Sequence, residues 1–190
     1  MPRPPAGGKT ASGGCKSTPV ATPDMIYLGM ASKIGGQELG PMWGVRPGAS
    51  GDISLKADET SNQYVAWFRM DAGPHFSSAV VYQDRLYVFP AHGGVLACFD
   101  ANTGEVIYQK RISGAGDFMT SPWANDGKVF NTDASGLTHV IRAGSEFELL
   151  DTNDLYERCW STPAAASGSL VIRTMENLFC IRRPLESGNR

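Results

Sequence analysis

A short phrase recurs four times along the chain: a Ser or Thr, a small residue or proline, an apolar run, and, after a polar turn, a second apolar run. The residues that open the four copies are Thr18, Ser78, Ser121 and Thr162, at successive spacings of 60, 43 and 41 residues. A period of about 40 to 45 residues is typical of repeats that each form a four-stranded sheet. Function must therefore be sought on a repeat scaffold.

Each repeat also contains a third apolar run at a constant offset, and the first three repeats contain a fourth. The third strands are predicted at residues 42–46, 95–100, 138–142 and 177–182, with one register shared by Val45, Phe99, Ile141 and Ile181. The fourth strands are predicted at residues 64–68, 106–111 and 146–150, with the bulky residues Trp67, Tyr108 and Leu150 at matching places.

The runs alternate with a period of two, are rich in β-branched and aromatic residues, and meet at Gly, Asn, Asp or Ser, as antiparallel strands require. No helical periodicity of useful length competes with them. The prediction is an all-β chain forming a partial β-propeller of four antiparallel blades, the last of them three-stranded. The expected blades are residues 17–70, 71–112, 113–160 and 161–183, between an irregular segment 1–16 and a tail 184–190.

Composition excludes several classes of protein. The 190 residues are 42% hydrophobic and carry a formal net charge of −2. A nucleic-acid surface would need clustered Lys and Arg, which this balance does not favour. No run approaches the roughly 18 consecutive apolar residues of a membrane-spanning helix. Residues 1–16 lack the apolar core of a signal peptide, so they do not indicate a compartment.

The four cysteines are placed by the repeat. Cys98 and Cys180 fall at the same position of two third strands with a whole blade between them, so we expect two buried thiols rather than a disulfide. Cys15 and Cys159 precede the opening Ser or Thr of the first and last repeats by the same three residues. They would be neighbours only in a ring closed at four blades, and in an open arc they should be too far apart to pair.

Several small and aromatic residues have a structural explanation. Asp100 is expected to accept hydrogen bonds from the backbone of the following turn, with Gly104 at positive φ. Gly127 and Gly168, each just before a second strand, are expected in tight turns. Trp67 and Tyr108 are expected to fill the space between adjacent blades.

Residues 96–108, Leu-Ala-Cys-Phe-Asp-Ala-Asn-Thr-Gly-Glu-Val-Ile-Tyr, resemble the PQQ-like repeat of the quinoprotein alcohol dehydrogenase-like superfamily. In that repeat a third strand ending in Asp-Ala leads through Thr-Gly-Glu or Thr-Gly-Lys into a fourth strand ending in Trp. In this chain Tyr108 occupies the position of that Trp in the second repeat, and Trp67 occupies it in the first. Arg46 and Arg142 occupy positions at which the family repeat usually has Asp. The chain looks most like the non-catalytic bacterial members, whose relatives include the propeller lipoprotein of the outer-membrane β-barrel assembly machinery.

The resemblance implies a ring of seven or eight blades, so we expect this chain to be a C-terminal part from which N-terminal blades are missing. Those blades would be its first partners, because an open arc leaves two apolar flanks uncovered. The resemblance also implies a periplasmic or other extracytoplasmic location in bacteria. A PQQ-dependent dehydrogenase would carry adjacent cysteines and calcium ligands. This sequence has no adjacent cysteines, so no cofactor is predicted.

No catalytic or metal-binding residue is predicted either. The chain shows no phosphate loop, zinc pattern, or nucleophile and base motif. Its histidines, His75, His92 and His139, are not at metal-ligand spacing, and His139 lies inside a third strand.

Topology sorts the loops by face. Loops from a fourth strand to the next first strand share a face with loops between second and third strands. We expect a ligand-binding face there, near the axis, where loops of a rigid scaffold commonly bind. Its candidate residues are His75, Phe76, His92, Phe118, Met119, Asp133, Trp160 and Glu176.

Two functions remain open. The preferred one is a non-catalytic scaffold that binds a protein or a small-molecule ligand in a bacterial envelope. The alternative is part of a PQQ-dependent or other propeller enzyme whose active site lies in the missing blades. The first repeat is longer than the others, in residues 31–40 and 47–63. The second insertion is expected to form either a small extra hairpin or a solvated loop.

Overall fold

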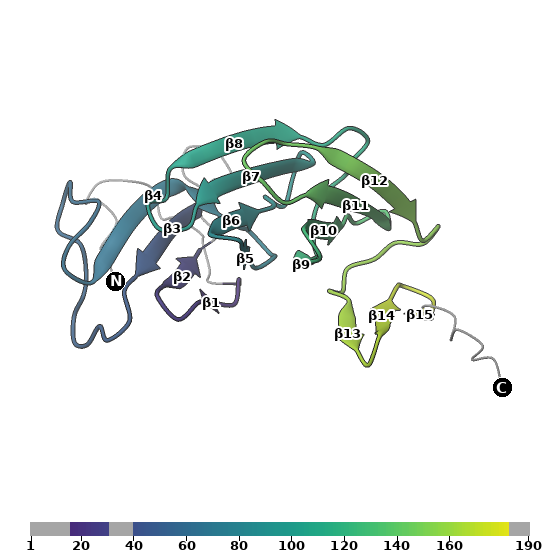
Figure 1. The fold of residues 1–190 in the computed structure, drawn as a ribbon, viewed down its shortest axis with the longest axis horizontal. Helices are drawn as coiled ribbons and strands as arrows, with labels where there is room; N and C mark the ends of the chain where they lie inside the picture. The colour runs from purple at the N-terminus through teal and green to yellow at the C-terminus, as the bar shows by residue number, and fades with distance from the viewer. Residues whose placement is uncertain (1–15, 31–39, 183–190) are drawn as a thin grey trace, which may run out of the picture.

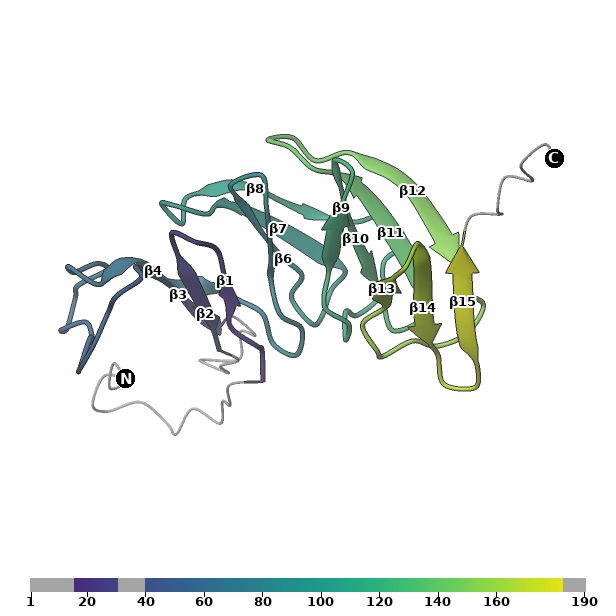
Figure 2. The same ribbon diagram turned by 60° about the horizontal axis from the view of Figure 1, so that its bottom comes forward.

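The fold is an arc of four antiparallel sheets arranged side by side (Figures 1 and 2). The computed structural model describes residues 16–30 and 40–182. In this part of the chain there is no helix, and the sheets contain four, four, four and three strands. Their innermost strands line the concave side of the arc in Figure 1. The predicted all-β partial propeller is confirmed.

The sheets follow one another in chain order and are here called blades 1 to 4. Blade 1 contains β1 (Val20–Ala21), β2 (Ile26–Gly29), β3 (Gly40–Val45) and β4 (Val65–Gly73). Blade 2 contains β5 (Val80–Tyr82), β6 (Arg85–Val88), β7 (Val95–Asp100) and β8 (Val106–Arg111). Blade 3 contains β9 (Trp123–Asn125), β10 (Lys128–Thr132), β11 (Leu137–Arg142) and β12 (Leu149–Asp154). Blade 4 contains β13 (Ala164–Ala166), β14 (Ser169–Arg173) and β15 (Leu178–Arg182).

The Ser or Thr that opens each repeat links its blade to a neighbour. The Thr18 N–H donates to the Ser78 hydroxyl at 2.9 Å, the Ser78 N–H to Ser121 at 2.9 Å, and the Ser121 N–H to Thr162 at 2.8 Å. Each hydroxyl accepts from the backbone of the preceding blade, so the recurrent residue sets the spacing of the blades beside the innermost strands.

The register of the third strands is the predicted one. Val45, Phe99, Ile141 and Ile181 pair with Ile26, Leu86, Val129 and Leu170 of their second strands. Asp100 accepts from the N–H groups of Asn102 and Thr103, both at 2.9 Å, and Gly104 has a φ of 73°, as the turn chemistry predicts. Gly127 and Gly168 also have positive φ, as expected of tight turns.

The fourth strands carry a repeated bulge that sequence offsets did not reveal. Trp67 pairs with Gly44 and Tyr108 with Cys98, one residue beyond a bulge in each case. The prediction that Leu150 is the counterpart of Trp67 and Tyr108 in blade 3 is wrong. Asp151 pairs with Val140 at that position, and Leu150 is the bulge residue. The turn before β12 is closed by Arg142 and Glu148, one residue further apart than Asp100 and Glu105, and this shifts the strand.

Trp67 joins blade 1 to blade 2. It is buried in a core cluster with Tyr27 and Met42 of its own blade and Leu86 and Phe99 of the next. Its indole N–H donates to the Ala101 carbonyl at 3.0 Å. The ring fits because the turn approaches without a side chain: a Cβ on Gly104 would lie 2.7 Å from a ring atom of Trp67. The predicted packing of Trp67 between blades is confirmed.

Tyr108 has the same position between blades 2 and 3. It lies in a cluster with Tyr87 and Cys98 of blade 2 and Val129 and Ile141 of blade 3. Burial raises the pKa of the Cys98 thiol to about 11 and that of Tyr87 to about 12, and it raises the pKa of Tyr108 as well. The side chains of this cluster are therefore neutral packing groups at ordinary pH.

The insertion after β3 covers the outer flank of blade 1. Leu55 is buried against Val45 and Val65, and Ile53 and Ala49 pack around them. The segment contains no strand, so the expected extra hairpin is wrong, and a purely solvated loop is wrong too. Its apolar residues shield a sheet face that would otherwise be exposed. The other insertion falls largely in residues 31–39, outside the described residues.

Blade 4 is packed less closely than the others. Ile181 is 49% exposed, although Phe99 and Ile141 in the same register are buried. Asp151, at the end of blade 3, supplies no aromatic ring to the turns of blade 4. The prediction that Cys180 is buried is wrong, since it is exposed on the flank that has no following blade. Cys98 and Cys159 are buried, and Cys15 lies outside the described residues.

We expect Trp67→Ala and Tyr108→Ala each to lower the free energy of unfolding by about 3 to 5 kcal/mol, because each empties a space between two blades. Urea denaturation measures this loss. Tyr156→Ala, which removes an 88% exposed ring, is the control and should cost less than about 0.5 kcal/mol. Losses below about 1 kcal/mol at Trp67 or Tyr108 would contradict a docking role for these rings.

Leu55→Ala should cost about 2 kcal/mol, because it removes the buried anchor of the loop that covers blade 1. Binding of a hydrophobic dye should rise in parallel as the face around Val45 opens. The neighbouring exposed Lys56→Ala should change neither reading. A Leu55→Ala protein with unchanged stability and dye binding would show that the loop does not protect this flank.

Candidate binding site on the channel face

Six loops meet at one face of the arc, here called the channel face: residues 74–79, 89–94, 112–122, 133–136, 155–163 and 174–177. Loops that connect one blade to the next are here called crossover loops, and loops between the second and third strands of a blade are called hairpin loops. Backbone hydrogen bonds join the two kinds of loop. The Phe118 N–H donates to Ala91 at 2.8 Å, Ala134 to Asp117 at 2.7 Å and Met175 to Arg158 at 3.0 Å. The loops that topology assigned to one face therefore do contact one another, pair by pair.

His75, Phe76 and His92 form a group on blade 2. The His75 ring lies 4.3 Å from Phe76 and 6.2 Å from His92, measured between centroids. His92 Nδ1 lies 2.7 Å from a carboxylate oxygen of Asp117, whose other oxygen accepts from the Gly93 N–H at 3.3 Å. Lys16 places its ammonium 4.3 Å from the Phe76 ring centroid. The group is held by polar and aromatic contacts and remains partly open to solvent.

Phe118 and Asp133 lie beneath the surface rather than on it. Phe118 is fully buried between Phe89, at 5.0 Å, and His139, at 5.9 Å. Asp133 is fully buried and accepts from Gly116, Ser135, Leu137 and the His139 ring. Both support the loops from below, and His139 is a buried, hydrogen-bonded side chain.

Hydrogen-bond donors around Asp133 stabilise its negative charge. Burial disfavours its ionised form, but the hydrogen bonds from His139 and Ser135, together with those from two backbone N–H groups, outweigh burial and lower the pKa of Asp133 below its ordinary value. Since these donors come from the crossover loop, the hairpin loop and β11, the carboxylate fastens blade 3 to the loop that enters it.

The most exposed apolar side chains of this face belong to blade 4. Trp160 is 55% exposed, Met175 62% and Tyr156 88%. The Arg158 guanidinium lies 5.5 Å from the Trp160 ring centroid. The two loops that carry these residues are joined through Glu157, which accepts from Thr174 and Asn177, and these bonds lower its pKa. We call Tyr156, Arg158, Trp160 and Met175 the blade 4 patch.

Of the other candidates, Met119 is half-buried and Glu176 is exposed beside the patch. Sequence reasoning missed Asp117, Arg158, Tyr156 and Lys16. A single Asp or Tyr in a loop has no pattern that marks it, and only the positions of the neighbouring loops show what each one contacts. The predicted residues thus divide into an exposed group on blade 2, an exposed group on blade 4 and a buried support.

Among residues 16–30 and 40–182, no group of three or more His, Cys, Asp or Glu side chains could hold a metal ion. The same part of the chain contains no helix long and apolar enough to cross a membrane. A hollow of about 320 Å³ lies at the opposite ends of the strands, between the turns around Asp24 and Asp84. It is open, is lined by polar and apolar residues alike, and lies away from the channel face.

No family model matches the chain, and no curated protein matches its sequence. Solved structures do. BamB from Moraxella catarrhalis is similar with a TM-score of 0.56 and 12% identity, over 92% of this chain and 60% of BamB. The computationally designed protein Ika4 is similar with a TM-score of 0.62 and 9% identity, over 96% of this chain and 99% of Ika4.

A quinohemoprotein alcohol dehydrogenase, ADHIIG from Pseudomonas putida HK5, is similar with a TM-score of 0.59 and 13% identity. The match covers 87% of this chain and 29% of the enzyme. The chain therefore spans less than two thirds of BamB and less than a third of the dehydrogenase. At these identities the likeness shows the fold alone, that of a β-propeller.

Asp133 should make stability depend on pH in the acid range. Because its folded pKa is depressed, the stabilisation is present above the ordinary Asp pKa of about 3.9 and is lost as the pH falls through the folded value. Asp133→Asn should cost about 3 to 5 kcal/mol at pH 7, since His139 and the loop donors lose a charged acceptor. Its loss of stability on acidification should be smaller than that of the unaltered protein.

Urea denaturation from pH 7 down to about pH 2 tests this, because the loss begins below the ordinary Asp pKa. Asp151→Asn, at an exposed position, is the control. Parallel curves for Asp133→Asn and the unaltered protein would contradict the role given to this carboxylate.

Proposed function

We propose that this chain is a non-catalytic propeller scaffold that binds a protein partner on its channel face in a bacterial envelope. The blades hold the loops at fixed positions, and the loops carry the contact residues. Binding, rather than a reaction, is the function that the exposed side chains serve.

The blade 4 patch carries this proposal. Two aromatic rings, a methionine and an arginine are exposed together on two loops, and these residue types are enriched where proteins bind one another. The bonds from Thr174 and Asn177 to Glu157 hold the loops before any partner arrives, which lowers the entropic cost of binding. The blade 2 group around Phe76 and His92 offers a second, more polar contact on the same face.

The fold similarities support the scaffold without selecting its partner. The adjacent cysteines that would mark a quinone-dependent enzyme are not in this sequence. What the channel face offers instead is exposed apolar side chains next to charged ones, with Arg158 against the Trp160 ring and Glu176 directly after Met175 in the chain. A protein partner with a complementary apolar surface is the ligand class that fits.

Trp160→Ala combined with Tyr156→Ala should reduce capture of the partner from an envelope extract of the source cells by at least about tenfold, the effect of losing a single binding hot spot. Quantitative mass spectrometry of the captured proteins gives the measurement. Met70→Ala is the matched control, because Met70 is also an exposed apolar residue but lies on β4. Equal capture by all three proteins, or stoichiometric binding of PQQ, would contradict the proposal.

A further inference from the structure

The hollow at the face opposite the channel face lies inside the arc, between the four-stranded blades 1 and 2. Three turns line it: residues 22–24 between β1 and β2, residues 82–84 between β5 and β6, and residues 101–102 after β7. Tyr27 and Val81 add apolar surface to this lining. Its volume of about 320 Å³ is at the lower end of the range for ligand pockets, so a single ring is the size of group that it can hold.

The next junction, between blades 2 and 3, has the same backbone frame. The Ala101 N–H donates to the Asp84 carbonyl at 3.0 Å, and the Ala143 N–H donates to the Gly127 carbonyl at 2.9 Å. Asp84 and Gly127 each end a tight turn at positive φ, 57° and 69° respectively. The turns of blades 2 and 3 are therefore equivalent, and each faces the blade that precedes it.

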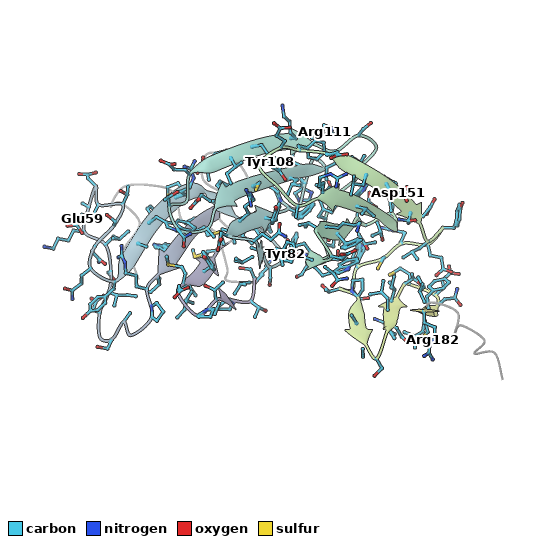
Figure 3. All side chains as sticks on the ribbon, viewed as in Figure 1. Glu59, Tyr82, Tyr108, Arg111, Asp151 and Arg182 are labelled. Carbon is cyan, nitrogen blue, oxygen red and sulfur yellow. The ribbon has the colours of Figure 1, made fainter. Side chains whose placement is uncertain are left out.

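Tyr82 occupies, at the second junction, the space that is open at the first. The strand pairing of β1 with β2 has the same register as that of β5 with β6, so Thr22 and Tyr82 are counterparts. Tyr82 lies where blade 2 meets blade 3 (Figure 3), and its hydroxyl accepts from the Gly127 N–H at 3.0 Å. Thr22 is too short to cross its junction, and its hydroxyl accepts within its own turn from the Met25 N–H at 3.1 Å.

The backbone donors of the two junctions differ accordingly. Among the described residues, no hydroxyl accepts from the N–H of Asp84, the counterpart of Gly127. The Gly144 N–H donates to the Tyr87 hydroxyl at 3.0 Å, but the N–H of its counterpart Asn102 turns back to the Asp100 carboxylate at 2.9 Å. The two bonds from backbone N–H to tyrosine hydroxyl at the second junction thus have no equivalent at the first.

Carboxylates around the hollow decide the charge that it accepts. Asp24 and Asp84 line it, and together with Asp100 they add to burial in raising the pKa of Tyr27. These carboxylates would repel an anionic ring. A neutral phenol can instead donate its proton to a carboxylate and accept from the Asp84 N–H, since a hydroxyl is both donor and acceptor.

We propose that the hollow binds a phenol group from outside the chain, in the place that Tyr82 takes at the next junction. Residues 1–15, 31–39 and 183–190 contain no Phe, Trp or Tyr, so these segments cannot provide the ring. The phenol belongs either to a small hydroxylated aromatic compound or to a tyrosine of another polypeptide, and its chemistry at the site is the same. This site is separate from the channel face, so the inference goes beyond the proposed function and does not rest on it.

The probe is p-cresol, which has the ring and hydroxyl of a tyrosine side chain. In ¹⁵N–¹H NMR spectra of the intact protein, the Asp84 amide should shift with p-cresol concentration, with a Kd of about 1 mM, a value that suits so small a ligand. The Gly127 amide is the internal control, because its acceptor is already in place. Toluene, which lacks the hydroxyl, should bind about tenfold more weakly. The anion 4-hydroxybenzoate should also bind more weakly than p-cresol.

Two substitutions exchange the properties of the junctions. Thr22→Tyr should fill the hollow from within, abolish the p-cresol shift of the Asp84 amide and raise the melting temperature by about 2 to 4 °C. Thr22→Ser keeps the hydroxyl in its turn and, as the matched control, should bind p-cresol as the unaltered protein does. Tyr82→Ala should open a second hollow, so that the Gly127 amide also responds to p-cresol. Circular dichroism verifies that each variant is folded.

N-acetyltyrosinamide, which carries the backbone of a tyrosine residue, separates the two sources of the phenol. Binding at least as tight as that of p-cresol assigns the site to a polypeptide, and weaker binding assigns it to a small compound.

The proposal is overturned if p-cresol at ten times the expected Kd leaves the Asp84 amide unchanged, or if toluene binds as well as p-cresol. It is also overturned if folded Thr22→Tyr protein still binds p-cresol, or if the Gly127 amide of folded Tyr82→Ala protein does not respond. None of these outcomes depends on the blade 4 patch, so the test stands apart from that of the proposed function.

Discussion

One hydrogen bond, repeated from blade to blade, sets the geometry on which the rest of the arc depends. The backbone N–H of each of the first three opening residues, Thr18, Ser78 and Ser121, donates to the hydroxyl of its counterpart in the next blade. A single bond of this kind contributes only about 0.5 to 1.5 kcal/mol. The bond matters because it fixes the position of one blade relative to the next. The innermost strands therefore lie at a constant offset, the faces of neighbouring sheets pack together, and the loops between blades begin from equivalent points.

Packing at the first two junctions between blades then depends on one aromatic residue each. Trp67 and Tyr108 fill the first two junctions, with the Trp67 ring seated against Gly104 and bonded to Ala101. At the third junction the equivalent residue is Asp151, and the periphery of blade 4 is correspondingly exposed at Ile181. The stability of the arc is therefore uneven, and its least covered sheet is also the one that carries the apolar loop patch.

The face on which these loops lie was predicted from the sequence, but the exposure of its individual residues was not. Strand order alone placed His75, His92, Trp160 and Glu176 on one face, because antiparallel connections alternate between the two ends of a blade. It could not separate the exposed members from Phe118 and Asp133, which are buried beneath them. Nor could it find Asp117, which is brought to His92 across 25 residues by the meeting of two loops.

The sequence by itself determined the repeat, the strand order, the register of the third strands and the packing of Trp67 and Tyr108, because these follow from local alternation and from spacing. Tertiary structure decided what depends on neighbours. It placed Asp151 rather than Leu150 at the third junction, because one extra turn residue shifts a bulged strand. It buried Cys98 and exposed Cys180, because the burial of a residue depends on whether another strand and another blade lie alongside it. The register of a cysteine within its own sheet does not reveal these neighbours.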